Sequence, residues 1–253
     1  MNIKEIKELL QTAHVSAEQL ELFAKDERSG VQQALRGYQS RLQKLEQAKQ
    51  KQYELLSYER DCLAKGYRHI AGVDEAGRGP LAGPLVVAAA ILKPDCCLYG
   101  VDDSKKLSEA KREQLYAEIL QQVEAYSVRI IEPPQIDSLN IYQATLQGMS
   151  ECLDELRPDV ALIDAMPVKS QDYECISIIK GDALSLSIAA ASIIAKVTRD
   201  RIMLGLDREY PEYGFAKHKG YPTQEHMQAI TQYGILACHR TSYEPIKSML
   251  GGH

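Results

Sequence analysis

The sequence has no apolar run long enough to cross a membrane. Its longest uninterrupted apolar stretch, Leu85–Leu92, has eight residues, whereas a membrane-spanning helix needs about 20. The N-terminus, Met1-Asn-Ile-Lys-Glu-Ile-Lys7, also lacks the apolar core of a secretory signal peptide. We therefore predict a cytoplasmic protein that has no membrane partner.

Cysteine pairs of the C-x-x-C type are also missing, because the six cysteines are scattered along the chain. Cys96 and Cys97 are adjacent, a spacing that suits neither a disulfide nor a zinc site. Cysteines spread in this way in a cytosolic chain usually serve as small apolar residues. The pattern therefore argues against zinc.

An excess of positive charge is absent too, since the net charge is −5. Proteins that wrap nucleic acid by bulk electrostatics are usually basic, so this class is disfavoured. Local basic patches stay compatible with the composition, and so does an acidic site whose charge is carried by bound metal. The length of 253 residues suits one large domain or one domain with an appendage.

Residues 1–66 contain no proline and are rich in Leu, Glu, Lys and Gln. Ser16 with Gln19, and Ser29 with Gln32, fit the capping-box pattern of a helix start. Apolar residues spaced by three or four mark one helical face, namely Val31, Leu35, Tyr38, Leu42 and Leu45. We predict a helical N-terminal extension, which is either an appendage packed on the body or an arm for a substrate or partner.

From residue 67 the pattern changes to a mixture of strands and helices. Short apolar runs predict five strands, at 68–73, 85–92, 125–132, 160–163 and 176–179, and Pro133-Pro134 ends the third. Longer periodic segments predict helices at 107–123, with Ser108 as its cap, and at 136–156, 184–206 and 223–233. We predict an α/β fold over residues 67–210, with a mixed sheet covered on both faces, and a C-terminal helical segment at 211–253.

Carboxylates stand where three of the predicted strands end. Asp74 and Glu75 follow one strand directly, Asp164 follows another, and Asp182 comes shortly after a third. Neighbouring strands end close together, so these acids can converge, and a bare cluster would repel itself and bind protons. Oxygen-only ligands favour a hard cation such as Mg²⁺ or Mn²⁺. Two such ions about 4 Å apart can cleave a phosphodiester.

Simpler roles are open for each acid taken singly. Asp182 precedes a long predicted helix and could be its N-cap, and Asp164 could start a turn. Asp102-Asp103 lies in a loop and is expected to be solvated. Asp200 and Asp207 lie on the long helix, where we expect them to pair with Lys or Arg.

The loop after Glu75 contains Gly77, Gly79 and Gly83. The spacing G-x-G-x-x-x-G differs from that of dinucleotide-binding proteins, and Pro80 removes an amide where a phosphate would need one. Glycines nevertheless allow close approach of the backbone to a ligand. A backbone group can sense a single hydroxyl, such as the ribose 2′-OH that distinguishes RNA from DNA. A packing turn between two strands is the alternative.

Six motifs occur in a fixed order over residues 67–245: Val73-Asp-Glu-Ala-Gly-Arg-Gly-Pro-Leu-Ala-Gly-Pro84, Asp103-Ser-Lys-Lys-Leu107, Ile163-Asp-Ala165, Lys180-Gly-Asp182, Ser187-Ile-Ala-Ala-Ala-Ser-Ile-Ile-Ala-Lys-Val197 and His218-Lys-Gly-Tyr-Pro222. Together they resemble the signature of ribonuclease HII, the bacterial type 2 ribonuclease H. Residues 1–66 lie outside this resemblance.

The resemblance implies the ribonuclease H-like fold, with a five-stranded mixed sheet in the order 3-2-1-4-5, flanked by helices. It implies an endoribonuclease that hydrolyses RNA in RNA/DNA hybrids and cuts duplex DNA 5′ to embedded ribonucleotides, leaving 3′-hydroxyl and 5′-phosphate ends. Such cutting belongs to ribonucleotide excision repair. It further implies two Mg²⁺ or Mn²⁺ ions in the substrate complex. We expect a monomer.

The resemblance also implies roles for individual residues. The family's catalytic and metal-binding acids match Asp74, Glu75, Asp164 and Asp182. Its glycine-arginine-glycine loop, which contacts the 2′-hydroxyl, matches Gly77, Arg78 and Gly79, and its ribose-sensing tyrosine matches Tyr221. Candidates for phosphate contacts are Ser104, Lys105, Lys106, Lys196, Lys217 and Lys219, with Arg199 and Arg201 further along the long helix. For His218 and His239 we expect a phosphate contact or a structural role.

Two other classes of function compete with this interpretation. One is a ribonuclease H-like protein that binds hybrid duplexes without cutting them. That class predicts a missing carboxylate, and all four are present. The other is a scaffold for repair or replication proteins, built on the N-terminal extension. Deletion of the extension would separate scaffolding from cleavage.

Overall fold

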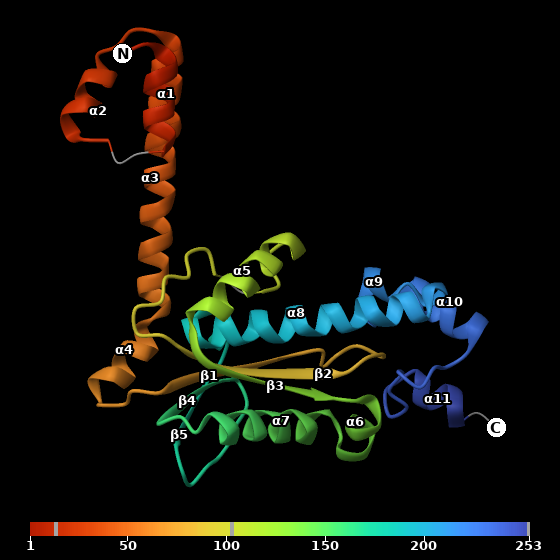
Figure 1. Cartoon of the computed structure of the whole chain (residues 1–253). Coiled ribbons are helices and arrows are strands. Elements are labelled where there is room, and N and C mark those ends of the chain that lie inside the picture. Colours follow the sequence, from red (N-terminus) through yellow and green to blue (C-terminus); the bar gives the residue numbers. More distant parts are fainter. Residues whose placement is uncertain (13–14, 102–103, 252–253) are drawn as a thin grey trace. The chain divides into compact units, whose positions relative to one another are not determined.

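The computed structural model describes residues 1–12, 15–101 and 104–251. The chain divides into two compact units, Met1–Tyr53 and Glu54–His253. Figure 1 labels the helices and strands of both. None of the described helices combines the length and the apolar character that crossing a membrane requires.

The N-terminal unit contains α1 (Ile3–Thr12), α2 (Ala17–Ala24) and the first part of α3 (Ser29–Leu55). Its apolar core is formed by Ile6, Leu10, Val15, Phe23, Val31, Leu35 and Tyr38. The capping box of Ser16 and Gln19 is confirmed. Gln32 instead donates hydrogen bonds to the carbonyls of Phe23 and Asp26. Leu42 and Leu45 are 42% exposed, so the predicted apolar face is buried only as far as Tyr38.

The second unit is built on a five-stranded mixed sheet in the order β3-β2-β1-β4-β5, as the resemblance implies. Strand β1 pairs antiparallel with β2 and parallel with β4, while β2–β3 is antiparallel and β4–β5 is parallel. The strands are β1 (Ile70–Ala76), β2 (Leu85–Leu92), β3 (Val123–Ile131), β4 (Val160–Asp164) and β5 (Glu174–Ile178).

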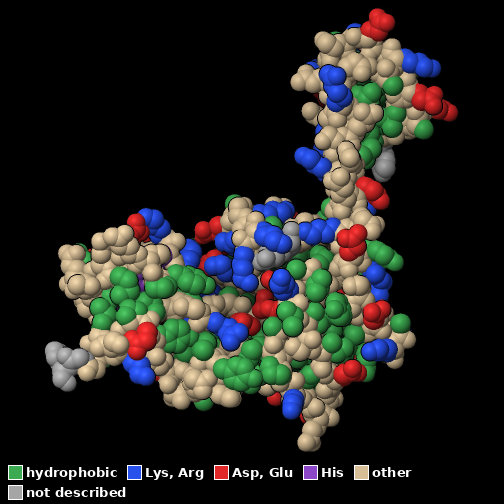
Figure 2. Space-filling view, turned by 180° about the vertical axis from the view of Figure 1, so that it is seen from behind, with side chains coloured by type: hydrophobic (Ala, Val, Ile, Leu, Met, Phe, Trp, Pro, Cys, Tyr) green, Lys and Arg blue, Asp and Glu red, His purple; other side chains and the backbone are tan. Residues whose placement is uncertain are grey.

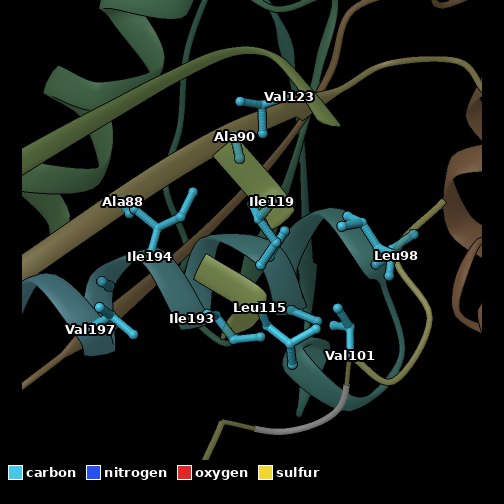
Figure 3. Close-up of a cluster of buried hydrophobic side chains, with 14 of the residues drawn as sticks. Ala88, Ala90, Leu98, Val101, Leu115, Ile119, Val123, Ile193, Ile194 and Val197 are labelled. Atoms are coloured by element: carbon cyan, nitrogen blue, oxygen red, sulfur yellow. The ribbon is translucent and has the colours of Figure 1, made fainter. Parts of the chain in front are cut away.

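Helices cover both faces of this sheet, which explains why β2 is apolar throughout. On one face Ala88 and Ala90 pack against α8 (Leu186–Glu209) and α5 (Glu109–Gln122) (Figure 3). On the other face Val87 and Ala89 pack against α7 (Ile141–Leu156). Alternate residues of one strand therefore fill two separate cores.

Helix α8 approaches β1 closely because Gly72 has no side chain. A Cβ at Gly72 would lie 2.1 Å from the carbonyl carbon of Ser187. The side chain of Ser185 caps α8 by accepting a hydrogen bond from the Ile188 N–H. The prediction that Asp182 could cap this helix is therefore wrong. Asp182 lies in a separate 3-10 turn, η1 (Gly181–Ala183).

The single helix predicted at 136–156 is two helices, α6 (Pro133–Leu139) and α7. Pro133 ends the preceding strand and also begins α6, since its fixed φ suits a first helical turn. Asn140 separates the helices with a φ of 66°. Its side chain accepts hydrogen bonds from Tyr142 N–H and Gln143 N–H, which starts α7.

The segment after α8 forms a third core, in which Leu81 and Ala82 of the β1–β2 loop pack against Tyr213, Phe215 and Ile230. Its helices are η2 (Pro211–Tyr213), α9 (Phe215–His218), α10 (Gln224–Tyr233) and α11 (Ile246–Gly251). The glycine-containing loop is thereby joined to the C-terminal segment.

Helix α4 (Ser57–Ala64) belongs to the second unit, although the sequence placed it within the extension. Its Cys62 packs against Ile70 of β1 and Val160 of β4. Its Glu59 is buried and accepts hydrogen bonds from Ser185 Oγ, at 2.6 Å, and from Ser187 N–H, at 2.9 Å. The compact boundary near residue 54 follows from this packing.

Candidate active site

The sheet brings the predicted acids to one edge. Val73 of β1 lies beside Ile163 of the parallel strand β4, so Asp74 and Asp164 follow at the ends of neighbouring strands. Asp164 in turn lies beside Ile178, the last residue of β5. The Gly181 N–H donates a hydrogen bond of 2.7 Å to Asp164 Oδ1, which ties the turn that carries Asp182 to the end of β4.

Burial and neighbouring carboxylates raise the pKa of the two acids on β1. Asp74 is 5% exposed, and burial, with the charges of Glu75 and Asp164, raises its pKa well above the usual range. Burial also raises the pKa of Glu75, with Arg78 opposing it. Lys105 Nζ lies 3.9 Å from Asp182 Oδ2. Glu75 and Asp182 thus each have a basic side chain within 4 Å, Arg78 and Lys105 respectively.

The donor set fits a hard divalent cation. Within the described residues, Glu75 Oε2 is buried without a hydrogen-bond partner, and the four candidate ligands offer only carboxylate oxygens. Among the described residues, no group of three or more His, Cys, Asp or Glu side chains is close enough together to hold a metal ion as it stands. Metal binding would therefore draw on side-chain movement or on oxygens of a substrate, as is common for Mg²⁺.

Two buried arginines hold the β1–β2 loop in place. Arg199 donates hydrogen bonds to the carbonyls of Ala82, at 3.1 Å, and Pro84, at 3.0 Å. Arg240 donates to the carbonyls of Gly77, at 2.6 Å, and Gly83, at 2.9 Å. Arg199 is 1% exposed, which favours a structural role over the predicted phosphate contact. Arg240 was not predicted as a site residue, because nothing in its local spacing marks a partner 163 positions away.

The two glycines of the Gly77-Arg-Gly79 segment differ in whether the fold has room for a side chain. Gly77 has a φ of 96°, and a Cβ there would lie 2.1 Å from Arg199 Nε. The fold itself therefore excludes a side chain at Gly77. At Gly79 a Cβ would only approach Tyr221 Cε1 to 3.5 Å, an ordinary contact. The fold leaves open space at Gly79.

A cavity of about 230 Å³ joins the acids to this loop. On the face seen in Figure 2, acidic and basic side chains gather around a hollow of the second unit. The cavity is lined by Asp74, Glu75, Ala76, Gly77, Arg78, Gly79, Ser104, Lys105, Ser192, Lys196, Arg199 and Tyr221. A larger hollow of about 990 Å³, beside Arg157 and Asp159, lies where β4 begins rather than where it ends.

Three of the residues predicted to contact phosphate, Ser104, Lys105 and Lys196, line the cavity. Ser104 Oγ is 3.1 Å from Ser192 Oγ. Lys196 Nζ donates a hydrogen bond of 2.6 Å to Asp200, and burial lowers the pKa of this lysine. Both Lys105 and Lys196 line the cavity that contains Asp74 and Glu75. Asp102 and Asp103 lie outside the described residues.

Other predicted basic residues are engaged away from this cavity. Lys217 forms an ion pair of 2.5 Å with Glu225, and Lys219 Nζ donates a 2.7 Å hydrogen bond to the Ala216 carbonyl. Arg201 pairs with Glu113 at 2.6 Å.

The two acids predicted to pair along α8 differ. Asp200 pairs with Lys196, at 2.6 Å, and with Arg112, at 3.6 Å. Asp207 accepts a 2.8 Å hydrogen bond from the Ala216 N–H instead. The expected pairing of Asp207 with a basic side chain is therefore wrong.

Three histidines form a buried stack behind Tyr221. Ring centroids are 4.5 Å apart for His218 and His226 and 5.3 Å for His226 and His239. His226 Nδ1 lies 3.0 Å from the Tyr221 carbonyl, and His226 Nε2 lies 3.1 Å from His239 Nε2. His218 and His239 thus have the structural role that was one of the two expected.

A ribonuclease H-like sheet with carboxylates at the carboxyl ends of its central strands defines a nucleic-acid hydrolase of the ribonuclease H class. The family model for ribonuclease HII matches residues 71–246. A second model, for the ribonuclease HII N-terminal domain, matches residues 2–63. The resemblance therefore extends into the region that the motifs left out.

Known proteins agree with this match over almost the whole chain. Ribonuclease HII of Halalkalibacterium halodurans is 48% identical over 253 residues, which cover 98% of this chain and 95% of that protein. Ribonuclease HII of Enterococcus faecalis is 49% identical over 257 residues, covering 98% of each. The crystal structure of ribonuclease H2 from Pyrococcus horikoshii aligns with a TM-score of 0.63 and 30% identity, over 73% of this chain and 98% of that one.

The chain belongs to the ribonuclease HII family. It is accordingly a hydrolase, an endoribonuclease of the ribonuclease H type.

Proposed function

We propose that this protein hydrolyses the RNA of RNA/DNA hybrids and cuts duplex DNA on the 5′ side of embedded ribonucleotides, leaving 3′-hydroxyl and 5′-phosphate ends. The observation that carries the proposal is a single cavity shared by two kinds of group. Asp74 and Glu75 line it together with Gly79 and Tyr221. Chemistry and ribose recognition would thus take place in the same cavity.

The four carboxylates, Asp74, Glu75, Asp164 and Asp182, are the groups that would hold divalent cations. Mg²⁺ or Mn²⁺ bound there would supply an activated water and positive charge at the leaving oxygen. Lys196 and Lys105 line the same cavity. We assign them, together with Ser104, to the phosphates on either side of the cleaved bond, since lysine binds phosphate as a point charge.

The Gly77-Arg-Gly79 segment and Tyr221 would recognise the ribose. Water attacks the phosphorus in this reaction, so the 2′-hydroxyl is free to act as a recognition group. The open space at Gly79 allows a sugar to approach the backbone. Tyr221 is 46% exposed and offers an aromatic face, and stacking of this kind contributes about 1–3 kcal/mol.

The first test is cleavage of duplex DNA that carries one ribonucleotide, with the all-DNA duplex as control, in Mg²⁺ and in Mn²⁺. We expect one nick, 5′ to the ribonucleotide, and none in the control. End analysis should find a 3′-hydroxyl and a 5′-phosphate. Binding without a nick in either metal would reject the proposal in favour of a protein that recognises hybrids without cutting them.

We further propose a monomer in which residues 211–253 present Tyr221 to the substrate. Every residue assigned to the site lies in the second unit, Glu54–His253. Residues 1–53 would then act as an arm for substrate or partner rather than in the chemistry. Light scattering of the full chain tests the monomer. Cleavage and duplex binding by a chain that starts at residue 54 test the arm.

A further inference from the structure

Arg240 and Tyr243 both bind carbonyls of the glycine-arginine-glycine segment. Arg240 is fully buried. Its Nη2 donates to the Gly77 carbonyl at 2.6 Å, and its Nη1 donates to the Arg78 carbonyl at 2.9 Å. The Tyr243 hydroxyl donates to the same Arg78 carbonyl at 2.7 Å. Two successive peptide carbonyls are therefore held in fixed directions.

Fixing these carbonyls also fixes the next two N–H groups. The Gly77–Arg78 and Arg78–Gly79 peptide bonds are trans, and in a trans peptide the C=O and the following N–H point in opposite directions. The N–H groups of Arg78 and Gly79 therefore point away from Arg240. Within the described residues neither N–H has a hydrogen-bond acceptor. Both residues line the cavity that contains Asp74.

The segment that carries the two side chains is itself anchored to α6. Asp137 accepts hydrogen bonds from the Thr241 N–H and hydroxyl, both at 2.8 Å. It also accepts from the Ser242 N–H at 3.0 Å and the Ser242 hydroxyl at 2.5 Å. Four hydrogen bonds on one carboxylate hold the stretch between Arg240 and Tyr243 in register with the loop.

The packing of the loop does not by itself require the hydrogen bonds to the Gly77 and Arg78 carbonyls. Arg240 already ties the loop through the Gly83 carbonyl, and Arg199 ties it through those of Ala82 and Pro84. The extra bonds to Gly77 and Arg78 act on the part of the loop that borders the cavity. A pair of aligned, unsatisfied amide donors is a site for one acceptor oxygen, and such donors bind best when they are preorganised.

We propose that Arg240 and Tyr243 are positioning residues for ribose recognition, which orient the Arg78 and Gly79 N–H groups toward the 2′-oxygen of the nucleotide. This rests on the proposed function. The two donors require an acceptor at the 2′ position, which a deoxyribose lacks. Loss of the clamp should therefore reduce the preference for a ribonucleotide without reducing affinity for duplex DNA.

The test measures selectivity rather than activity. Full-length protein carrying Asp74→Asn, to prevent cutting, is titrated with a duplex containing one ribonucleotide and with the matched all-DNA duplex. Tyr243→Phe is added to remove the hydroxyl, which donates to the Arg78 carbonyl and accepts a hydrogen bond of 3.2 Å from Arg240 Nη1. Arg240→Lys is added to remove the forked contact. Tyr213→Phe is the matched control, because its hydroxyl also donates to a backbone carbonyl, that of Gly234, at 2.7 Å.

We expect Tyr243→Phe to lower the affinity ratio of the two duplexes about fivefold, since the glycine-arginine-glycine segment loses one neutral hydrogen bond, that to the Arg78 carbonyl. Arg240→Lys should bring the ratio close to one. Affinity for the all-DNA duplex should stay unchanged, and Tyr213→Phe should keep the parental ratio.

Three results would overturn the proposal. An unchanged ratio in Tyr243→Phe, with the parent still discriminating, would reject the clamp and leave the proposed function standing. An equal fall of the affinity ratio in Tyr213→Phe would show that any loss of stability in the C-terminal segment has this effect. A parent that neither discriminates in binding nor cuts when Asp74 is restored would reject the proposed function itself. The melting temperature of Arg240→Lys is measured as well. If that variant is unfolded, the result for Tyr243→Phe alone decides the proposal.

Discussion

Asp164 accepts a hydrogen bond of 2.7 Å from the Gly181 N–H, one residue before Asp182. A carboxylate assigned to chemistry thus also shapes the backbone that carries a second one. The same contact therefore links the end of β4 to the turn after β5.

Because of this contact, we expect two substitutions of Asp164 to differ in stability. Asparagine keeps an acceptor for the Gly181 N–H but removes the charge, whereas alanine removes both. We expect Asp164→Asn to unfold at nearly the parental temperature, and Asp164→Ala to lose about 1–2 kcal/mol of stability. Both should lose turnover by more than about 100-fold. Equal stability of the two variants in urea titrations would show that the contact does not hold the turn.

Asp74 should be needed for turnover and unfavourable for folding. Its buried carboxylate lies beside Glu75 and Asp164, and its pKa is raised, so a neutral side chain relieves repulsion near pH 7. We expect Asp74→Asn to reduce turnover by more than about 1,000-fold and to raise the melting temperature in metal-free buffer.

Asp159→Asn is the matched control for Asp74. Asp159 accepts hydrogen bonds from the Arg68 and His69 N–H groups, at 2.7 and 2.8 Å, and these lower its pKa. Its loss should cost stability and leave activity per folded molecule unchanged. An Asp74→Asn enzyme that turns over normally in Mg²⁺ would sink the site assignment.

Gly79 and Gly77 should respond differently to alanine. A Cβ at Gly79 meets only Tyr221, at 3.5 Å, so Gly79→Ala should fold with a parental melting temperature. Its methyl group would nevertheless occupy the space assigned to the sugar. We expect cleavage at a single ribonucleotide to fall by about 10-fold or more, whereas Gly77→Ala should mainly lose stability. Full activity of a well-folded Gly79→Ala protein would contradict ribose contact at this loop.

Tyr221 should contribute preference rather than general affinity. Tyr221→Ala removes an aromatic face, which corresponds to about 1–3 kcal/mol of stacking, whereas Tyr221→Phe retains it. We expect the alanine variant to lose about 5- to 100-fold in cutting at the RNA–DNA junction, with a much smaller loss in duplex binding. The ratio of junction cutting to cutting within an all-RNA strand is the measurement. If alanine leaves that ratio unchanged, Tyr221 has no part in the recognition.

His226 should make the stability of the protein sensitive to acid. Burial lowers its pKa from 6.5 to about 4, with the neighbouring His218 and His239 adding to this effect. The unfolded chain therefore takes up a proton near pH 6.5 that the folded chain takes up only near pH 4. Stability from His226 is full above about pH 6.5 and is lost as the pH falls toward 4.

Urea unfolding at several pH values measures this contribution. Between pH 7 and pH 4.5 we expect the parent to lose about 2 kcal/mol more than His226→Gln, because one pKa unit is worth about 1.4 kcal/mol. His69→Gln, at a half-exposed histidine, should follow the parent. Parallel curves for the parent and His226→Gln would show that His226 does not contribute to the acid sensitivity.

Most of the sheet could be predicted because its signals are local. The apolar runs of β1, β2 and β4, and the acids that follow them, are read from neighbouring residues. Helix ends were less certain, since Asn140 breaks a continuous periodic pattern with one left-handed residue. The sequence left open whether Asp182 caps α8, because several polar residues precede that helix, and only the backbone path selects Ser185.

The sequence by itself determined the order of strands and helices, the family motifs and the identity of the acids, because each depends on residue type and short-range spacing. The tertiary structure alone decided which groups support them. Arg199 and Arg240 bind loop carbonyls more than 100 positions away, and α4 caps α8 through Glu59. Such contacts join distant parts of the chain, and no local pattern encodes them, because the partners meet only once the sheet and its helices have packed.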